Sequence, residues 1–415
     1  MTERHSLRSL PRAAWVLAAV LAGTLGAIAP QMVKRTARPV DRIGIDPLVG
    51  MPGGPRTSAA GLRNRIGVME ARLREQSGDV GAAVLLADAL LRLARATSDG
   101  RATNHAEQVL TDVLKESPAQ YDALRMLGAV YLSQHRFRDG LGVARKARNL
   151  RPNDSWNYGV MGDALIELGE YDQAFEAFET MISMRPHAAA YARVAYGREL
   201  RGDLAGAAEA MQMAAEATNG QDSEAQAWYA AQLGELYLRM QKLDEAGREY
   251  RRAAFLYPDY PLAMIGQGKV RVARGDRDGA LEIYLAQLKR TPTLDLAGRI
   301  GDLYAERGDA ANSERYYELA EDVAGPAAAQ TEANLALFLA EHGRKLPDAV
   351  RIAEMVGRKR RDIFTDDALA WAYYKVGRFQ EARAASERAM RTGTRDERIV
   401  SHAARIHEAA ARDRG

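Results

Sequence analysis

Apolar and small side chains recur at three- and four-residue intervals from about residue 62 to the C-terminus. Alternation of Val, Ile or Thr with polar residues, which is typical of half-buried strands, is scarce. Ala, Leu, Arg and Glu are abundant, and all four are good helix formers. The pattern therefore predicts an all-α protein, with short turns carrying Gly-Asp, Pro-Asn or Pro-Asp pairs between its helices.

The helical pattern itself repeats along the chain. The offsets that relate Gly162, Ala174, Phe178 and Pro186 recur with a period of 34 residues. Small residues at the first two positions let two antiparallel helices approach closely, the aromatic ring fills the gap beside them, and Pro ends the second helix. Positions that share these offsets, and that we expect to hold the repeats together, are Gly128, Tyr131, Pro152, Gly162, Ala174, Phe178, Pro186, Gly234, Tyr237, Ala246, Tyr250, Pro258, Gly268, Ala280, Tyr284, Pro292, Gly301 and Tyr304.

This spacing resembles the tetratricopeptide repeat (TPR), a helix-turn-helix unit of about 34 residues. The resemblance covers about residues 80–394. It implies a right-handed superhelix of helical hairpins, because one unit cannot bury its apolar face alone and must stack on its neighbours. Such a superhelix has a concave groove.

The repeats divide the chain into three parts. Residues 1–33 are predicted to be a signal peptide or a transmembrane signal anchor, residues 34–61 a flexible linker rich in Pro and Gly, and residues 62–415 the solenoid. The expected segments of the solenoid are a packing helix at 62–77, units near 80–118, 121–154, 155–187, 188–220, 227–260, 261–293, 294–326, 332–362 and 363–394, and a capping helix at 395–413.

The N-terminus has the features of an export signal. Three arginines, Arg4, Arg8 and Arg12, precede the uncharged stretch 13–29, and Pro30 follows it. The proline disfavours cleavage after Ala29, so we favour an uncleaved anchor over a cleaved signal peptide. A buried core helix is the alternative. Basic residues on both sides of the stretch leave the membrane orientation open, and export of the body is the expectation for a signal of this form.

The charge and cysteine content of the sequence exclude only a few classes of function. The formal net charge is +3, but residues 1–42 hold seven Lys/Arg against two acids, which leaves 51 basic and 53 acidic residues in the body. A nearly neutral body argues against nucleic-acid binding, which requires many phosphates to be neutralised. The chain has no Cys, so it has neither a disulfide nor a thiolate site.

The TPR resemblance places the first helix of each unit along the groove. There we expect an aromatic and charged surface for a protein or peptide partner, since aromatic rings supply buried area and charges fix the register. The alternative is that the tryptophans only close gaps between helices and the charges are solvated. No Asn stands one position after the structural small residue, which argues against a clamp for a free C-terminal carboxylate. The candidate groove residues are Trp156, Asp163, Glu167, Trp228, Glu235, Arg239, Lys269, Asp302, Glu306, Trp371 and Lys375.

The sequence offers little evidence of catalytic or metal-binding motifs. His402 and His407 are five residues apart, which does not align two ligands on a helix. We find no HExxH motif, phosphate-binding loop or nucleophile elbow. The basic run 357–361, "GRKRR", is interpreted as a solvated turn, with docking of an acidic partner as the alternative. We therefore expect no catalytic residue, metal or cofactor.

The sequence thus predicts a non-enzymatic TPR scaffold at the cell envelope, exported or anchored in the membrane through its N-terminal helix. A cytoplasmic TPR regulator of opposite topology is one alternative. The other is a substrate-recognition subunit for an enzyme that a second chain supplies, because helical repeats leave no room for a catalytic domain.

Overall fold

The computed structural model describes residues 59–97, 101–218, 222–331 and 333–413. The segment expected to be a signal or anchor, 1–33, and nearly all of the predicted linker 34–61 lie outside these ranges. None of the helices in the described part of the chain is both long enough and apolar enough to span a bilayer.

Within the described residues the chain forms twenty α-helices and no strands, so the prediction of an all-α fold is confirmed. The helices of the first half are α3 (Ala59–Glu75), α4 (Val80–Thr97), α5 (Arg101–Glu116), α6 (Tyr121–Ser133), α7 (Phe137–Leu150), α8 (Ser155–Leu168), α9 (Tyr171–Met184), α10 (Ala188–Leu200), α11 (Leu204–Glu216) and α12 (Ser223–Arg239). Those of the second half are α13 (Leu243–Leu256), α14 (Pro261–Ala273), α15 (Arg277–Arg290), α16 (Leu294–Glu306), α17 (Ala310–Thr331), α18 (Ala333–Glu341), α19 (Leu346–Lys359), α20 (Ile363–Lys375), α21 (Phe379–Ala389) and α22 (Glu397–Arg412).

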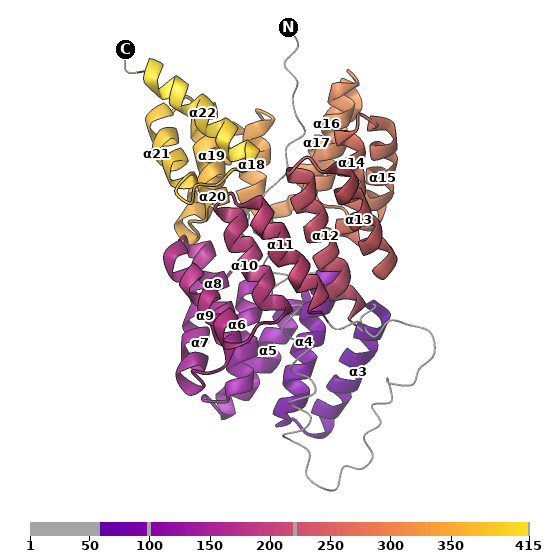
Figure 1. Ribbon diagram of the computed structural model, residues 1–415, viewed down its shortest axis with the longest axis vertical. Helices are drawn as coiled ribbons and strands as arrows, with labels where there is room; N and C mark the ends of the chain where they lie inside the picture. Colours follow the sequence, from indigo (N-terminus) through magenta and orange to yellow (C-terminus); the bar gives the residue numbers. More distant parts are fainter. Residues whose placement is uncertain (1–58, 98–100, 219–221, 332, 414–415) are drawn as a thin grey trace.

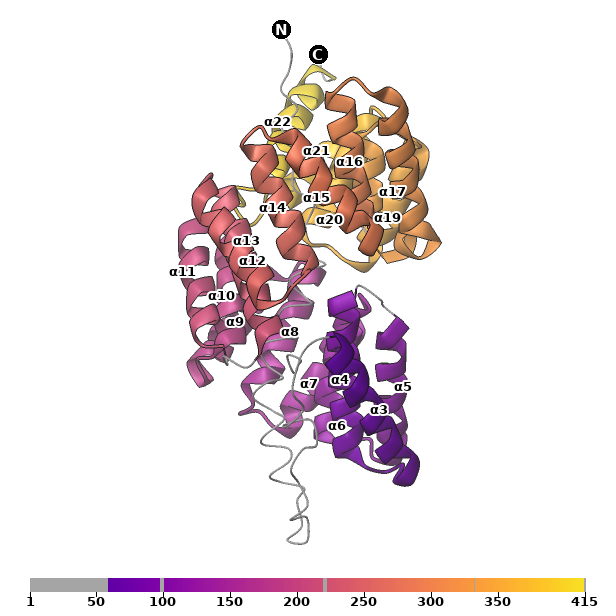
Figure 2. The same ribbon diagram turned by 90° about the vertical axis from the view of Figure 1, so that its right-hand side faces the viewer.

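Consecutive helices pack as antiparallel hairpins that stack into a superhelix (Figure 1). We call the even-numbered helices α4 to α20 the A helices and the odd-numbered helices α5 to α21 the B helices. Helix α17 is interrupted at Gly325, whose φ of 60° lies outside helical values. Seen from the side, the hairpins follow a curved path in which α3 to α7 lie at one end and α14 to α22 at the other (Figure 2).

The turns between helices follow from local side-chain chemistry. Asp203 caps α11 by accepting a hydrogen bond from the Gly206 N–H, and Asp276 caps α15 in the same way through the Gly279 N–H. The preceding A helices end in glycines with positive φ, Gly202 at 80° and Gly275 at 83°. A Gly-Asp pair therefore ends one helix and begins the next.

Glycines inside the A helices make room for aromatic rings of the B helices. A Cβ atom on Gly162 would lie 2.3 Å from the Phe178 ring, and one on Gly268 would lie 2.1 Å from the Tyr284 ring. The ring thus packs against the glycine sixteen residues before it, within its own unit. This contact gives the physical reason for the Gly and aromatic offsets of the repeat.

The superhelix also contacts itself far along the chain. Ile363 and Phe364 of α20 and Ile399 of α22 belong to the same apolar core as helices α4 to α10. In Figure 1 the C-terminal hairpin, α20 to α22, lies directly beside α8 and α10. A second such link is the ion pair between Arg92 at the end of α4 and Asp222 before α12, with 3.1 Å between nitrogen and oxygen.

Candidate functional site

The three candidate groove tryptophans are buried and lie in three separate apolar clusters. Trp156 packs with α4 to α10, Trp228 with α10 to α14, and Trp371 with α15 to α22. The Trp156 indole N–H donates to the backbone oxygen of Arg125 at 3.3 Å, and the Arg125 guanidinium lies 4.5 Å from the centre of the ring. Trp156 therefore joins α8 to α6 and presents little surface to a partner.

Trp228 and Trp371 are likewise held by neighbouring rings. Trp228 meets Tyr229 edge-on at 5.0 Å between ring centres. Trp371 stacks on His402 of α22 at 3.8 Å, and the candidate Lys375 lies 5.8 Å from the Trp371 ring. The structure thus does not bring the three tryptophans together on one surface.

The candidate charges link consecutive A helices. Both oxygens of Asp163 on α8 accept hydrogen bonds from the Arg193 guanidinium of α10, at 3.0 and 2.7 Å. Glu235 of α12 pairs with Lys269 of α14 at 2.9 Å, although these two residues occupy the same position in adjacent repeats. An acid in one unit therefore faces a base in the next.

Similar pairs of opposite charges involve other A helices. Arg239 of α12 pairs with Glu199 of α10 at 2.7 Å. Asp302 of α16 pairs with His342, which follows α18, at 2.8 Å. At the edge of the groove Glu306 pairs with Arg277, at the start of α15.

Tyrosines of the B helices extend two of these pairs. The Tyr250 hydroxyl donates to Glu235 at 2.7 Å, and the Tyr317 hydroxyl donates to Asp302 at 2.9 Å. In both units the acid directly follows the structural glycine, and the tyrosine is the aromatic residue of the repeat. The residue after the glycine is thus engaged with its own B helix and with the next A helix.

The exposure of these charges rises from α8 to α16. The Asp163 side chain on α8 is 4% exposed, Lys269 on α14 is 18% exposed and Asp302 on α16 is 32% exposed. Although burial acts to lower it, the hydrogen bond and charge of Asp302 raise the pKa of His342. The part of the predicted groove that water reaches therefore lies over α14, α16 and the end of α18.

Burial perturbs the two acids of α8. It raises the pKa of Asp163 to about 7, against the opposing charge of Arg193. It raises the pKa of Glu167 to about 8, and the negative charge of Asp362 adds to the effect while Arg360 opposes it. These carboxyl groups are part of the packed interior.

Arg360 is the polar residue that the sequence interpretation misplaced. The basic run 357–361 was predicted to be a solvated turn, and this is wrong for Arg360, which is buried. Its guanidinium pairs with Glu167 at 2.6 Å and with Asp362 at 2.8 Å, and it lies 5.3 Å from the centre of the Phe137 ring. Arg361, by contrast, has an exposed side chain.

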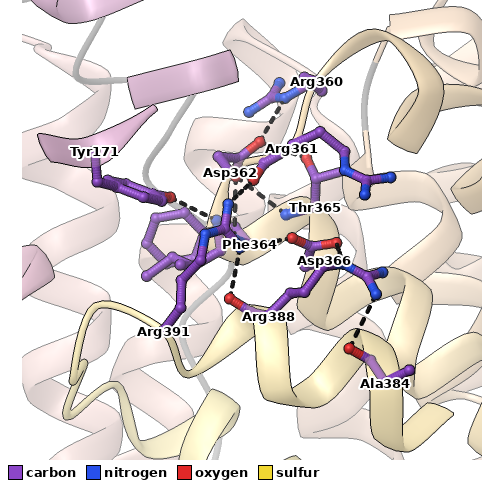
Figure 3. A network of polar contacts seen from close by, with 11 residues as sticks. Tyr171, Arg360, Arg361, Asp362, Phe364, Thr365, Asp366, Ala384, Arg388 and Arg391 are labelled. Atoms are coloured by element: carbon purple, nitrogen blue, oxygen red, sulfur yellow. Dashed lines mark hydrogen bonds and ion pairs between the residues drawn. The ribbon is translucent and has the colours of Figure 1, made fainter. Parts of the chain in front are cut away.

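Backbone contacts complete this junction, where Figure 3 shows Tyr171 directed toward the start of α20 beside the Arg360–Asp362 ion pair. The Arg361 backbone N–H donates to the backbone carbonyl oxygen of Glu167 at 2.9 Å. The Ile363 backbone N–H donates to the Tyr171 hydroxyl at 2.8 Å. A Cβ atom on Gly169, which has a φ of 80°, would lie 2.6 Å from the Arg361 oxygen. Only glycine allows the two segments to approach this closely.

A second set of contacts lies at the end of α10. The Thr392 hydroxyl donates to the Leu200 oxygen at 2.7 Å, and Arg239 lies 3.4 Å from Asp396, the cap of α22. We call both sets together the closure contact. It joins the turns after α8, α10 and α12 to the C-terminal hairpin.

A model of the family described as "Tetratricopeptide repeat" matches residues 160–222 and 231–295. The chain contains tetratricopeptide repeats. The matched ranges comprise α9 to α11 and α13 to α15, most of α8 and the C-terminal part of α12. They include the Glu235–Lys269 pair and the Gly–aromatic contacts described above.

Solved structures share the repeat architecture at low sequence identity. A chain of the APC/C hetero-tetramer Cut9-Hcn1 is 15% identical with a TM-score of 0.50, and the match covers 85% of this chain and 60% of that one. The human IFIT1 dimer with m7Gppp-AAAA is 15% identical with a TM-score of 0.53, covering 81% of this chain and 78% of that one. These likenesses concern the fold alone.

One curated relative matches over a short stretch. Protein O-mannosyl-transferase TMTC1 of Mus musculus is 28% identical over 88 residues, which is 20% of this chain and 9% of that protein. This chain therefore spans only a small fraction of the length of that relative.

Proposed function

We propose that this protein is a non-enzymatic scaffold or adaptor that holds a protein or peptide partner in the TPR groove. The observation that carries the proposal is the partly exposed row of paired charges on α14 to α18, centred on Lys269, Asp302 and Glu306. Repeat superhelices present extended concave surfaces of this kind to their partners. The tryptophans and the acids of α8 are buried, so they are not part of the surface in this proposal.

The partner in this proposal makes polar contacts as well as apolar ones. Acids and bases alternate on adjacent A helices, so an extended segment with charges of both signs would find opposite charges along its length. The interaction needs no reacting group, metal or cofactor from this chain. The alternative is that the same surface binds the substrate of an enzyme that a second chain supplies.

We also propose that the scaffold works at the cell envelope, exported or anchored through residues 13–29. The support for this is the uncharged stretch behind three arginines. A reporter that is active only outside the cytoplasm, fused to the C-terminus, tests the location. An inactive fusion would favour the cytoplasmic adaptor instead.

The groove is tested by crosslinking and recovery with the full chain. Glu306→Arg reverses one charge of this row at the end of α16 without opening the buried core, and we expect partner recovery to fall about tenfold. Glu216→Arg, on the exposed face of α11, is the matched control and should recover the partner normally. Equal recovery by the groove variant would contradict the proposed site.

A further inference from the structure

The outer face of α13 carries a large exposed aromatic side chain. Phe255 is 85% exposed, whereas every other large apolar residue in the described ranges is at most 46% exposed. Helix α13 packs its opposite side, with Ala246, Tyr250 and Ala253, into the core. The Phe255 ring is therefore not required for packing within its own unit.

The repeat register shows that this phenylalanine is a departure from its neighbours. Phe255 lies two residues after the buried Ala253, and the equivalent residues of α7, α9, α11 and α15 are also buried: Ala147, Met181, Ala214 and Gln287. The corresponding exposed residues on α7, α9, α11 and α15 are polar: Asn149, Ser183, Glu216 and Lys289. Since the fold accepts polar residues here, an aromatic ring indicates a role outside the fold.

Three arginines share this face of α13. Arg248, Arg251 and Arg252 precede Phe255 by seven, four and three residues, which places all four side chains on one side of a helix. At a rise of 1.5 Å per residue, the set extends over about 10 Å. We call these four residues the α13 face.

Two of the arginines lack an acidic partner. Arg252 lies 3.4 Å from Glu249, but no carboxylate in the described part of the chain lies within ion-pairing distance of Arg248 or Arg251. The α13 face thus combines free guanidinium groups with an uncovered ring.

We propose that the α13 face docks an acidic segment of a partner protein that places one apolar side chain against Phe255. Arginine binds carboxylates through two parallel hydrogen bonds, which fixes the register of such a segment. The ring supplies apolar area that water otherwise covers. This surface is on a B helix, so it is independent of the proposed groove and adds a second attachment point to the scaffold.

The size of the face favours a peptide over a polyanion. Three guanidinium groups with Glu249 beside them give a weak local field, and the body of the chain is close to neutral. Binding of RNA or of an anionic membrane depends on many phosphates being neutralised together. Two or three carboxylates beside one apolar anchor match what α13 offers.

A labelled peptide tests the proposal directly. The probe is a short Glu-rich peptide with one central Leu, titrated with the full chain and followed by fluorescence anisotropy. We expect binding that weakens with added salt, and at least about tenfold weaker binding for Phe255→Ser and for Arg251→Glu. Because both side chains are exposed, thermal unfolding of these variants should match that of the unaltered protein.

Matched controls separate this site from general charge effects. Lys289→Ser and Arg145→Glu alter exposed residues of α15 and α7 and should leave peptide affinity unchanged. Replacing the central Leu of the peptide by Ser should weaken binding as much as Phe255→Ser does. Failure of the peptide to bind, equal affinity for Phe255→Ser, or tighter binding to single-stranded RNA or to phosphatidylserine vesicles would overturn the proposal.

Discussion

The Tyr171 hydroxyl accepts a hydrogen bond at 2.8 Å from the backbone N–H of Ile363, a residue 192 positions later in the chain. Ile363 is the first residue of α20, and its N–H has no acceptor within that helix. A tyrosine at the start of α9 thus completes the N-terminus of the last A helix. The bond is buried and forms part of the closure contact.

Tyr171→Phe removes this acceptor and leaves the Ile363 N–H buried without a partner. We expect a loss of about 1–3 kcal/mol of stability, the cost of an unsatisfied buried donor. Hydrogen exchange measured along the chain should become faster at 360–366 and 390–396 and remain unchanged in α13 and α14. Tyr158→Phe, on α8, is the control and should change neither region.

The Arg360 guanidinium pairs with the buried Asp362 carboxylate and with the buried Glu167 carboxyl group, and its removal leaves Asp362 without a counter-charge. For Arg360→Met we expect destabilisation of about 3–5 kcal/mol in urea unfolding, as for other broken buried ion pairs. Combining it with Asp362→Asn removes the stranded charge and keeps an oxygen that can cap α20, so the double variant should be more stable than Arg360→Met alone. Arg361→Met alters an exposed side chain and should change stability by less than about 0.5 kcal/mol. A double variant that is less stable than the single one would contradict this assignment.

The comparison of Arg360 with Arg361 shows which contacts could not be predicted from the sequence. Helix boundaries and the stacking of units depend on contacts within about 34 residues, which the repeat pattern encodes, so the superhelix could be predicted. The closure contact depends on a small rotation per unit accumulated over several units. Nothing in the sequence of the basic run 357–361 indicates which of its arginines will pair with Glu167.

The helices that carry the candidate groove residues could be predicted from the sequence, but the burial of those residues could not. The offsets correctly placed Asp302 and Lys269 on A helices that face their neighbours. They could not show that Trp156 and Trp228 would be buried, because the repeat fixes the side of a helix and not how tightly adjacent A helices pack. The acid–base pairing of Glu235 with Lys269 could have been noticed, since equivalent positions of consecutive units carry opposite charges.

Stability should depend on pH through Glu167, whose pKa is raised from 4.5 to about 8 mainly by burial. Between pH 6.5 and 8 the folded chain retains a proton on Glu167 that the unfolded chain has released. Stability therefore falls as pH rises through this window, and it is greatest below it as far as this group is concerned. Burial and the Arg360 charge lower the pKa of His135 to about 4, so His135 is neutral in both states over most of this window.

Urea unfolding at a series of pH values measures the slope. Glu167→Gln should reduce the decline by up to about 1.4 kcal/mol per pH unit, the contribution of one proton. The decline that remains is assigned to Asp163, whose pKa burial raises to about 7, and to His342, whose pKa Asp302 raises against the effect of burial. Parallel pH profiles for the variant and the unaltered protein would show that Glu167 is ionised in the fold.

Gly268 and Gly142 are both glycines inside helices, but only one has a neighbour where a methyl group would stand. A Cβ atom on Gly268 would lie 2.1 Å from the buried Tyr284 ring, whereas one on Gly142 would have nothing within 4 Å. Both Gly→Ala changes gain helix propensity, so their difference isolates the contact with the ring. Gly142→Ala should stabilise by about 0.5–1 kcal/mol. Gly268→Ala should destabilise by about 1–3 kcal/mol, because the ring must move out of a packed core. Thermal unfolding of both variants measures this difference. If Gly268→Ala were as stable as Gly142→Ala, the Tyr284 ring would be free to shift. The glycine of the repeat would then not determine the spacing of the two helices in a unit.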